Sequence, residues 1–440
     1  MDASGPFHGV LDRIGTPLPA IVRAMTPTPT RTRSRSRSRR ALLCAALLTL
    51  TVQTAAAPAL ASRPEGPGGH GGRDCVRTER PLDGDARRIL DITRKAKSDL
   101  KLKSVELRVT VDGREVLTDA LGESMTGVPA EPDMHFRAGS VAFAHIGTAL
   151  LQLVEEGRVG LDDTVEQWLP DVPKADRITL RMLASNTTGL HDYVTDPAFL
   201  AELGPHPFRQ WSPAQLLAYP YHHSFWYEPG TSWSYSHANY LLLVAALEKI
   251  TGTRIDRLVR ERVTGPLGLR NTQNNFTPDI PSPVLHAFTS DRGFYEESTF
   301  WNPSWTTAPG AVITTHICDL ATSARAIGSG ELLSYRSYRT LLNPGTVGLG
   351  GGTARCPASI CLKQTEAKHF GLGVIVVNGW VLQNPSFSGY AAIQAYLPSK
   401  GLAIAVSATK TPTTPAGNMA EVVAQRIAAA LAPNDPLAIT

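Results

Sequence analysis

The stretch Phe136-Arg137-Ala138-Gly139-Ser140-Val141-Ala142-Phe143 bears most directly on how this 440-residue chain folds. Apolar residues continue after it, so we expect a helix over residues 140–156 that ends at Gly157. A serine that opens a helix lies beside unpaired backbone N–H groups and partial positive charge, a favourable setting for a nucleophile. Phe143 lies one helical turn later, on the same face. A nucleophilic serine needs a nearby base to take its proton, and the hydrocarbon ring of Phe143 cannot accept one.

Local patterns on either side predict the remaining elements. Residues 85–102 have the spacing of an amphipathic helix, and Asp112-Gly113 and Asn378-Gly379 are hairpin turns between alternating segments. Further helices are predicted near residues 178–183, 213–217 (with Ser212 as N-cap), 238–250, 256–265 and 419–431, and strands at 391–397 and 402–407. This order predicts an α+β fold, in which both chain ends form an antiparallel sheet flanked by helices, with an all-helical lobe inserted.

The charge distribution separates the N-terminal region from the rest. Residues 1–61 hold eight Arg, no Lys and two Asp, so the remainder is mildly acidic and offers no basic surface for nucleic acid. Six of these Arg precede a mostly apolar run and then Ala59-Leu60-Ala61, the order of a secretory signal cleaved after Ala61. We therefore expect an exported protein without a membrane-spanning segment in its mature part. The alternating Arg-Ser run could instead be an RNA-binding tail, but the adjoining apolar run argues against that.

The expected organisation has four parts. They are an N-terminal extension with signal (1–61), a disordered linker (62–84), a domain (85–432) and a tail (433–440). Within the domain, the sheet lobe takes about 85–135 and 306–432, and the helical lobe about 136–305.

Four cysteines lie beyond the expected signal, and an even number in an exported protein indicates disulfides. Cys356 and Cys361 enclose a short loop and can pair, which leaves Cys75 for Cys318. The alternative is four free thiols. No Cys/His cluster has metal-site spacing, so we expect neither a metal nor a cofactor.

Short motifs recur in a fixed order along the domain. After the opening stretch they are Leu151–Gly157, Ile178–Leu183, Thr187–Leu190, Glu228–Thr231, Ser234-Tyr235-Ser236, Pro266–Leu269, Phe370–Gly373 and Gly389-Tyr390. Together they resemble the serine β-lactamase and penicillin-binding protein family, nearest its class C β-lactamase, D-Ala-D-Ala carboxypeptidase and esterase branch. The resemblance covers roughly residues 85–432. It implies a β-lactamase/transpeptidase-like fold with three motifs that carry acyl-transfer chemistry.

The first of these motifs is S-x-x-K, in which the lysine helps to remove the serine proton. Ser140 occupies the nucleophile position, and Phe143 replaces the lysine. Two interpretations follow: Phe143 packs in the core with Ser140 as a helix N-cap, or Phe143 lines a ligand-binding cleft.

The second motif, Y-x-N or Y-x-S, keeps Tyr235 but has His237 at its third position. An imidazole can act as acid or base, so His237 is either a substitute base for Ser140 or a polar cleft residue. His191-Asp192 and His222-His223 are weaker cleft candidates, since surface or packing roles suit them better.

The third motif, K-T-G or H-x-G, corresponds to Gln383-Asn384-Pro385, counted back from Gly389-Tyr390. The positive group is missing there, and Pro replaces Gly. Lys410-Thr411-Pro412 looks similar to K-T-G, but it follows the last strand and is expected to be a turn. Trp233 belongs to an aromatic group that either stacks on a ligand or forms the core of the helical lobe.

Each motif lacks a principal group, and loss of a coupled nucleophile–base unit costs on the order of 10⁶ in rate. We therefore predict an exported pseudo-hydrolase that binds an acyl, peptide-like or cell-envelope ligand with little or no turnover. Ser140, Tyr235 and His237 hold the catalytic positions, and the expected ligand contacts are Phe143, Gln383, Asn384 and Trp233. The alternative is an active serine hydrolase, esterase or acyltransferase that forms an acyl-enzyme at Ser140, with Tyr235 and His237 handling protons. A purely structural or partner-binding exoprotein is a third class, with no feature that favours it beyond cysteines and a Gly-rich loop.

Overall fold

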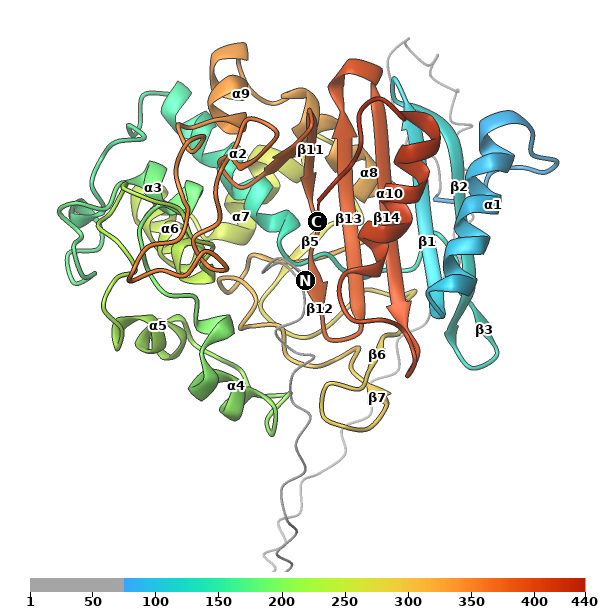
Figure 1. Ribbon diagram of the computed structural model, residues 1–440, viewed down its shortest axis with the longest axis horizontal. Helices are drawn as coiled ribbons and strands as arrows, with labels where there is room; N and C mark the ends of the chain where they lie inside the picture. The colour runs from blue at the N-terminus through green and yellow to red at the C-terminus, as the bar shows by residue number, and fades with distance from the viewer. Residues whose placement is uncertain (1–74, 440) are drawn as a thin grey trace, which may run out of the picture. The chain divides into compact units, whose positions relative to one another are not determined.

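The computed structural model describes residues 75–439, so the expected signal and most of the expected linker lie outside it. Its largest element is an antiparallel sheet in the order β3-β2-β1-β14-β13-β11-β10-β9, with β12 also paired to β13 (Figure 1). The strands are β1 (Leu102–Val111), β2 (Arg114–Met125), β3 (Val128–Pro129), β9 (Lys368–Phe370), β10 (Ile375–Val377), β11 (Trp380–Gln383), β12 (Ser386–Phe387), β13 (Tyr390–Leu397) and β14 (Leu402–Lys410). Because β1 pairs with β14, the two ends of the domain share one sheet.

Helices cover both faces of this sheet because side chains alternate along the strands. On β14, residues such as Ile404 and Val406 join a buried cluster with side chains of α1 (Gly84–Asp99) and α10 (Met419–Leu431). Ala403, on the opposite face of the strand, packs with Ala324 of α8 (Ile317–Ser329). Figure 1 shows α10 in front of β13 and β14, with α8 behind them.

The chain between β4 (Phe136–Arg137) and β8 (Val312–Thr315) contains the helical lobe. Its helices are α2 (Val141–Glu155), η1 (Val165–Gln167), α3 (Leu180–Ser185), η2 (Tyr193–Thr195), α4 (Pro197–Leu203), α5 (Pro213–Tyr221), α6 (His237–Thr251), α7 (Ile255–Val259) and η3 (Arg260–Thr264). Short strands β5 (Gln273–Asn275), β6 (Phe288–Thr289) and β7 (Glu296–Glu297) follow; α9 (Tyr335–Leu342) and η4 (Pro398–Lys400) lie later in the chain. Among the described residues, no helix is both long and apolar enough to cross a bilayer.

The predicted α+β class is confirmed, and local signals account for much of it. Asp112, Gly113, Asn378 and Gly379 all have positive φ, as two-residue hairpin turns with a right-handed strand twist require. Ser212 and Gln215 form a complete capping box at the start of α5. The Cys75–Cys318 and Cys356–Cys361 disulfides are also present, as expected.

The expected linker extends too far toward the C-terminus. Residues 75–83 lie against β2, where Arg77 and Arg80 both bind the carboxylate of Asp119. The Asp119 side chain is fully buried, so removing its cationic partners would leave an uncompensated charge. Composition cannot reveal this anchoring because it depends on single side chains within a polar segment.

The expected tail is also part of the domain. Leu437 and Ile439 are buried in the cluster that contains α10, and the Trp380 indole N–H donates to the carbonyl of Asp435. Residues 433–439 therefore pack as part of the folded domain.

Glu106 of β1 is fully buried, and its carboxyl oxygens have no hydrogen-bond partner within the described chain. Burial raises its pKa well above the usual 4.5, as do the carboxylates of Asp133 and Glu131, while Arg77 acts in the opposite direction. The folded protein thus holds this proton more tightly than the unfolded chain. The associated stability is fully present below about pH 4.5 and is lost as the pH rises toward the folded-state pKa.

We therefore expect Glu106→Gln to reduce the loss of stability as the pH rises from 4.5, because the variant has no carboxyl to ionise. Urea unfolding of both proteins at several pH values measures this difference. Exposed Glu123 of β2 provides the matched control, Glu123→Gln. Equal pH dependence in Glu106→Gln and the unmodified protein would contradict the assignment.

Candidate active site

A cavity of about 180 Å³ brings together segments that are distant in the sequence. Its wall combines the start of α2, η2, the start of α6 and the segment from β11 to β13. The predicted site residues in this wall are Ser140, Tyr235, His237, Gln383 and Asn384. The three degenerate motifs therefore meet at a single cavity.

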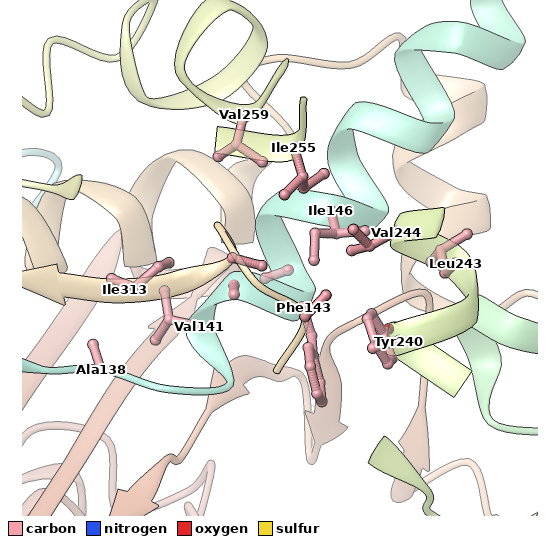
Figure 2. Close-up of a cluster of buried hydrophobic side chains, with 14 of the residues drawn as sticks. Ala138, Val141, Phe143, Ile146, Tyr240, Leu243, Val244, Ile255, Val259 and Ile313 are labelled. Carbon is pink, nitrogen blue, oxygen red and sulfur yellow. The ribbon is translucent and has the colours of Figure 1, made fainter. Parts of the chain in front are cut away.

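Phe143 and Trp233, which we expected to contact a ligand, are buried and do not line this cavity. The Phe143 ring stacks on Tyr240 of α6, with ring centroids 3.6 Å apart. Figure 2 shows Phe143 projecting from α2 toward Tyr240 within a cluster of buried apolar side chains. Trp233 lies in a second buried cluster, 5.9 Å from the Phe370 ring. Burial of these large apolar rings stabilises the core, so both residues are structural.

The Ser140 side chain faces the cavity and does not cap α2. Ser140 is the N-cap residue, yet it makes no side-chain capping hydrogen bond and its φ of −65° is already helical. It forms a hydrogen bond with the Tyr235 side chain. Burial raises the pKa of Tyr235, and the nearby Asp192 carboxylate adds to this effect, so the phenol stays protonated at neutral pH.

Among the described residues that line the cavity, His237 is the only histidine, and Asp192 holds it in place. Its Nδ1 lies 3.1 Å and 3.0 Å from the two carboxylate oxygens of Asp192, and its backbone N–H donates to the same carboxylate at 3.1 Å. No described residue makes a hydrogen bond with Nε2. One carboxylate therefore fixes both the backbone and the ring.

The third-motif position contributes no charge, because Gln383 and Asn384 have neutral amide side chains. Both amides make hydrogen bonds to other residues of the protein. Gln383 donates to the carbonyl of Gly373, and Asn384 donates to Glu421 at 2.9 Å. Pro385 restricts the opposite wall: a Cβ added to Gly139 would lie 3.0 Å from the Pro385 Cβ. Gly139 also has a φ of +28°, so this position requires glycine on two counts.

Two cavity residues, Asp192 and Lys410, were considered in the sequence but not assigned to the site. Asp192 was a weak candidate, and nothing linked it to His237, 45 residues away. Lys410, expected to belong to a turn, is the last residue of β14 and lines the cavity. Neither spacing nor composition indicates which of these residues reach the same cavity.

The cavity thus combines a serine hydroxyl, a phenol and an oriented imidazole, which are groups suited to acyl chemistry. The residues that the structure describes contain no group of three or more His, Cys, Asp or Glu side chains placed to hold a metal ion.

Comparison with known proteins agrees with this geometry. The family model described as Beta-lactamase matches residues 91–429. A putative penicillin-binding protein, PbpX of Bacillus subtilis, is 25% identical over 223 residues, which cover 50% of this chain and 54% of PbpX. AmpH of Escherichia coli, a D-alanyl-D-alanine-carboxypeptidase/endopeptidase, is 27% identical over 42% of this chain and 48% of AmpH. The chain thus spans about half the length of these two relatives.

Solved structures show the same fold over most of the described chain. A D-stereospecific amidohydrolase from Streptomyces sp. has a TM-score of 0.64 and 25% identity, covering 77% of this chain and 97% of that protein. A D-amino acid amidase from Ochrobactrum anthropi, complexed with L-phenylalanine amide, has a TM-score of 0.65 and 19% identity, covering 79% and 99%. The second likeness supports the fold alone.

Proposed function

This chain belongs to the Beta-lactamase family, and we propose that its cleft binds a small acyl or peptide-like ligand with little or no peptidase or β-lactamase turnover. One observation carries the proposal: the position one turn after Ser140 holds a phenyl ring stacked on Tyr240, where the family mechanism needs an amine. The uncharged Gln383 at the third motif adds to this loss. We further propose that the protein is exported, which the signal-like sequence and the two disulfides support.

The known chemistry of the similar proteins supports this ligand class. They include a penicillin-binding protein, a carboxypeptidase/endopeptidase, an amidohydrolase and EstCE1, a hydrolase with promiscuous acyltransferase activity. The ligands and reactions that these names describe all involve compounds in which an acyl group is bonded to nitrogen or oxygen. The cavity of this chain offers aromatic walls at Trp305, Phe387 and Tyr390 beside the polar Ser140 region, which suits an acyl compound with an apolar substituent.

A second candidate function is acyl transfer from an ester to Ser140. The contact between His237 and Asp192 favours it, because an oriented imidazole can take a proton. Esters would be favoured over amides, since their leaving groups need less help from an acid.

Binding is testable with L-phenylalanine amide and benzylpenicillin as probes. At ten times its dissociation constant, a bound probe should stabilise the folded protein by about 1.4 kcal/mol, and Ser140→Ala should retain this effect. Thr195→Trp places a bulky ring at the cavity rim and should abolish it, because Thr195 is an exposed residue of the wall. Thermal unfolding with and without each probe provides the measurement.

The matched control is Thr126→Trp, at an exposed threonine between β2 and β3 that does not line the cavity. It should leave the stabilisation unchanged. Rapid hydrolysis of benzylpenicillin, or a stabilisation that survives Thr195→Trp, would disprove the proposal.

A further inference from the structure

We propose that His237, positioned by Asp192, is the base that activates Ser140 toward ester acyl groups in place of the missing lysine. The inference rests on the proposed binding of an acyl compound in this cleft. It assigns the proton transfer to Asp192, the N-cap residue of η2, and His237, the first residue of α6, both outside the helix that follows the serine.

The four side chains concerned line one cavity and are connected through Tyr235. Ser140 forms a hydrogen bond with Tyr235, and the Tyr235 and His237 rings meet edge-on with centroids 5.1 Å apart. Phe143 borders the imidazole at 6.1 Å, and Tyr193 at 5.9 Å. These neighbouring aromatic rings restrict rotation of the His237 imidazole, so it faces the cavity in a limited range of orientations.

The Asp192 carboxylate determines which imidazole nitrogen can act as the base. A carboxylate can only accept a hydrogen bond, so the proton of a neutral imidazole lies on Nδ1. The lone pair is then on Nε2, the nitrogen that no described residue engages. Asp192 also stabilises the imidazolium that forms when Nε2 takes a proton, as the acidic member of a Ser-His-Asp triad does.

The other groups near Ser140 suit this role less well. Tyr235 would have to act as a phenolate, and burial keeps its phenol protonated. The Asp192 carboxylate is engaged by Nδ1 and by the backbone N–H groups of His237 and Val194. Lys410 lines the same cavity, but no contact among the described residues joins it to Ser140.

The proposed step balances with an ester and water as the reactants. Ser140 Oγ bonds to the acyl carbon while its proton passes to His237 Nε2, directly or through the Tyr235 hydroxyl. The bond from carbon to the leaving oxygen then breaks, and that oxygen takes the proton from Nε2 as the alcohol departs. Water repeats the sequence on the acyl-serine, which regenerates Ser140 and releases the acid. No oxidant, metal or cofactor enters this balance.

The test follows p-nitrophenyl acetate hydrolysis and acetylation of Ser140 by mass spectrometry, using the full mature protein. Ser140→Ala should abolish acetylation, and His237→Ala should lower the hydrolysis rate by about 10²–10⁴-fold. Added imidazole should partly restore His237→Ala but not Ser140→Ala. His223→Ala is the matched control: it removes another histidine outside the cavity wall and should leave the rate unchanged.

The variant Asp192→Asn tests whether Asp192 orients the His237 imidazole or only stabilises the fold. The amide would donate to Nδ1 and leave the proton on Nε2, so the rate should fall about 10²-fold or more while thermal stability changes little. The loss should fall on kcat with KM nearly unchanged, because the asparagine keeps the shape of the cavity wall. Tyr193 and Tyr235 also face the ring, and their phenols stay protonated at neutral pH because burial raises their pKa values.

Each adverse result identifies what fails. No acetylation of Ser140 in the unmodified protein would overturn this inference, while probe-induced thermal stabilisation would leave the proposed binding function intact. Acetylation that is unaffected by His237→Ala or by Asp192→Asn would also overturn it. Loss of the rate in Lys410→Met but not in His237→Ala would assign the base to the lysine.

Discussion

Replacing Phe143 with lysine should destabilise the protein severely without producing a β-lactamase. Phe143 is fully buried, and its ring stacks 3.6 Å from that of Tyr240. Removing a buried Phe side chain typically costs about 3–5 kcal/mol, and a buried ammonium without a carboxylate adds a further penalty. Domains of ordinary stability have only about 5–15 kcal/mol in total, so much of the stability should disappear.

A lysine that extends toward Ser140 would still not complete the family mechanism. His237 remains at the second motif, and Gln383 remains at the third with its amide bonded to the Gly373 carbonyl. Urea unfolding measures the first effect, and hydrolysis of a fluorescent penicillin measures the second. Phe143→Leu is the control, since it keeps an apolar side chain and should cost clearly less. Substantial penicillin turnover in Phe143→Lys would show that the other two motifs are intact.

The sequence shows which residues occupy the motif positions of this site, but not which side chains Phe143 and His237 contact. Replacement of the lysine is visible in S-x-x-F, because helical spacing fixes which residue faces Ser140. Whether Phe143 enters the cavity or the core depends on Tyr240, which comes from another helix. The partner of His237 is equally non-local, since Asp192 lies before α4 and meets the ring only when α6 packs against η2.

The fold was more predictable because its signals are local. Asp112-Gly113 and Asn378-Gly379 specify their hairpins through backbone conformation, whatever the rest of the chain does. The boundaries at residues 75–83 and 433–439 were wrong because each depends on distant partners. Arg77 and Arg80 need Asp119 to hold the first segment, and the second needs the core around α10.

Removing the Cys75–Cys318 disulfide should lower the free energy of unfolding by a similarly large amount to Phe143→Lys. The bond joins residues 243 positions apart, and in the chain-entropy account a loop of this length contributes about 5 kcal/mol by restricting the unfolded chain. It also attaches residues 75–83 to the start of α8, which packs on the sheet. The variant with both Cys75→Ser and Cys318→Ser should therefore unfold at a much lower urea concentration than the unmodified protein.

The chain contains its own control for this prediction. Cys356 and Cys361 are only 5 positions apart, so the same account gives about 2 kcal/mol for the pair Cys356→Ser and Cys361→Ser. We expect urea unfolding under non-reducing conditions to show that the variant lacking Cys75 and Cys318 is less stable, by about 3 kcal/mol, than the variant lacking Cys356 and Cys361. Equal losses would reject the loop-length explanation. A small loss for Cys75 and Cys318 alone would show that Arg77 and Arg80, through Asp119, already hold the segment in place.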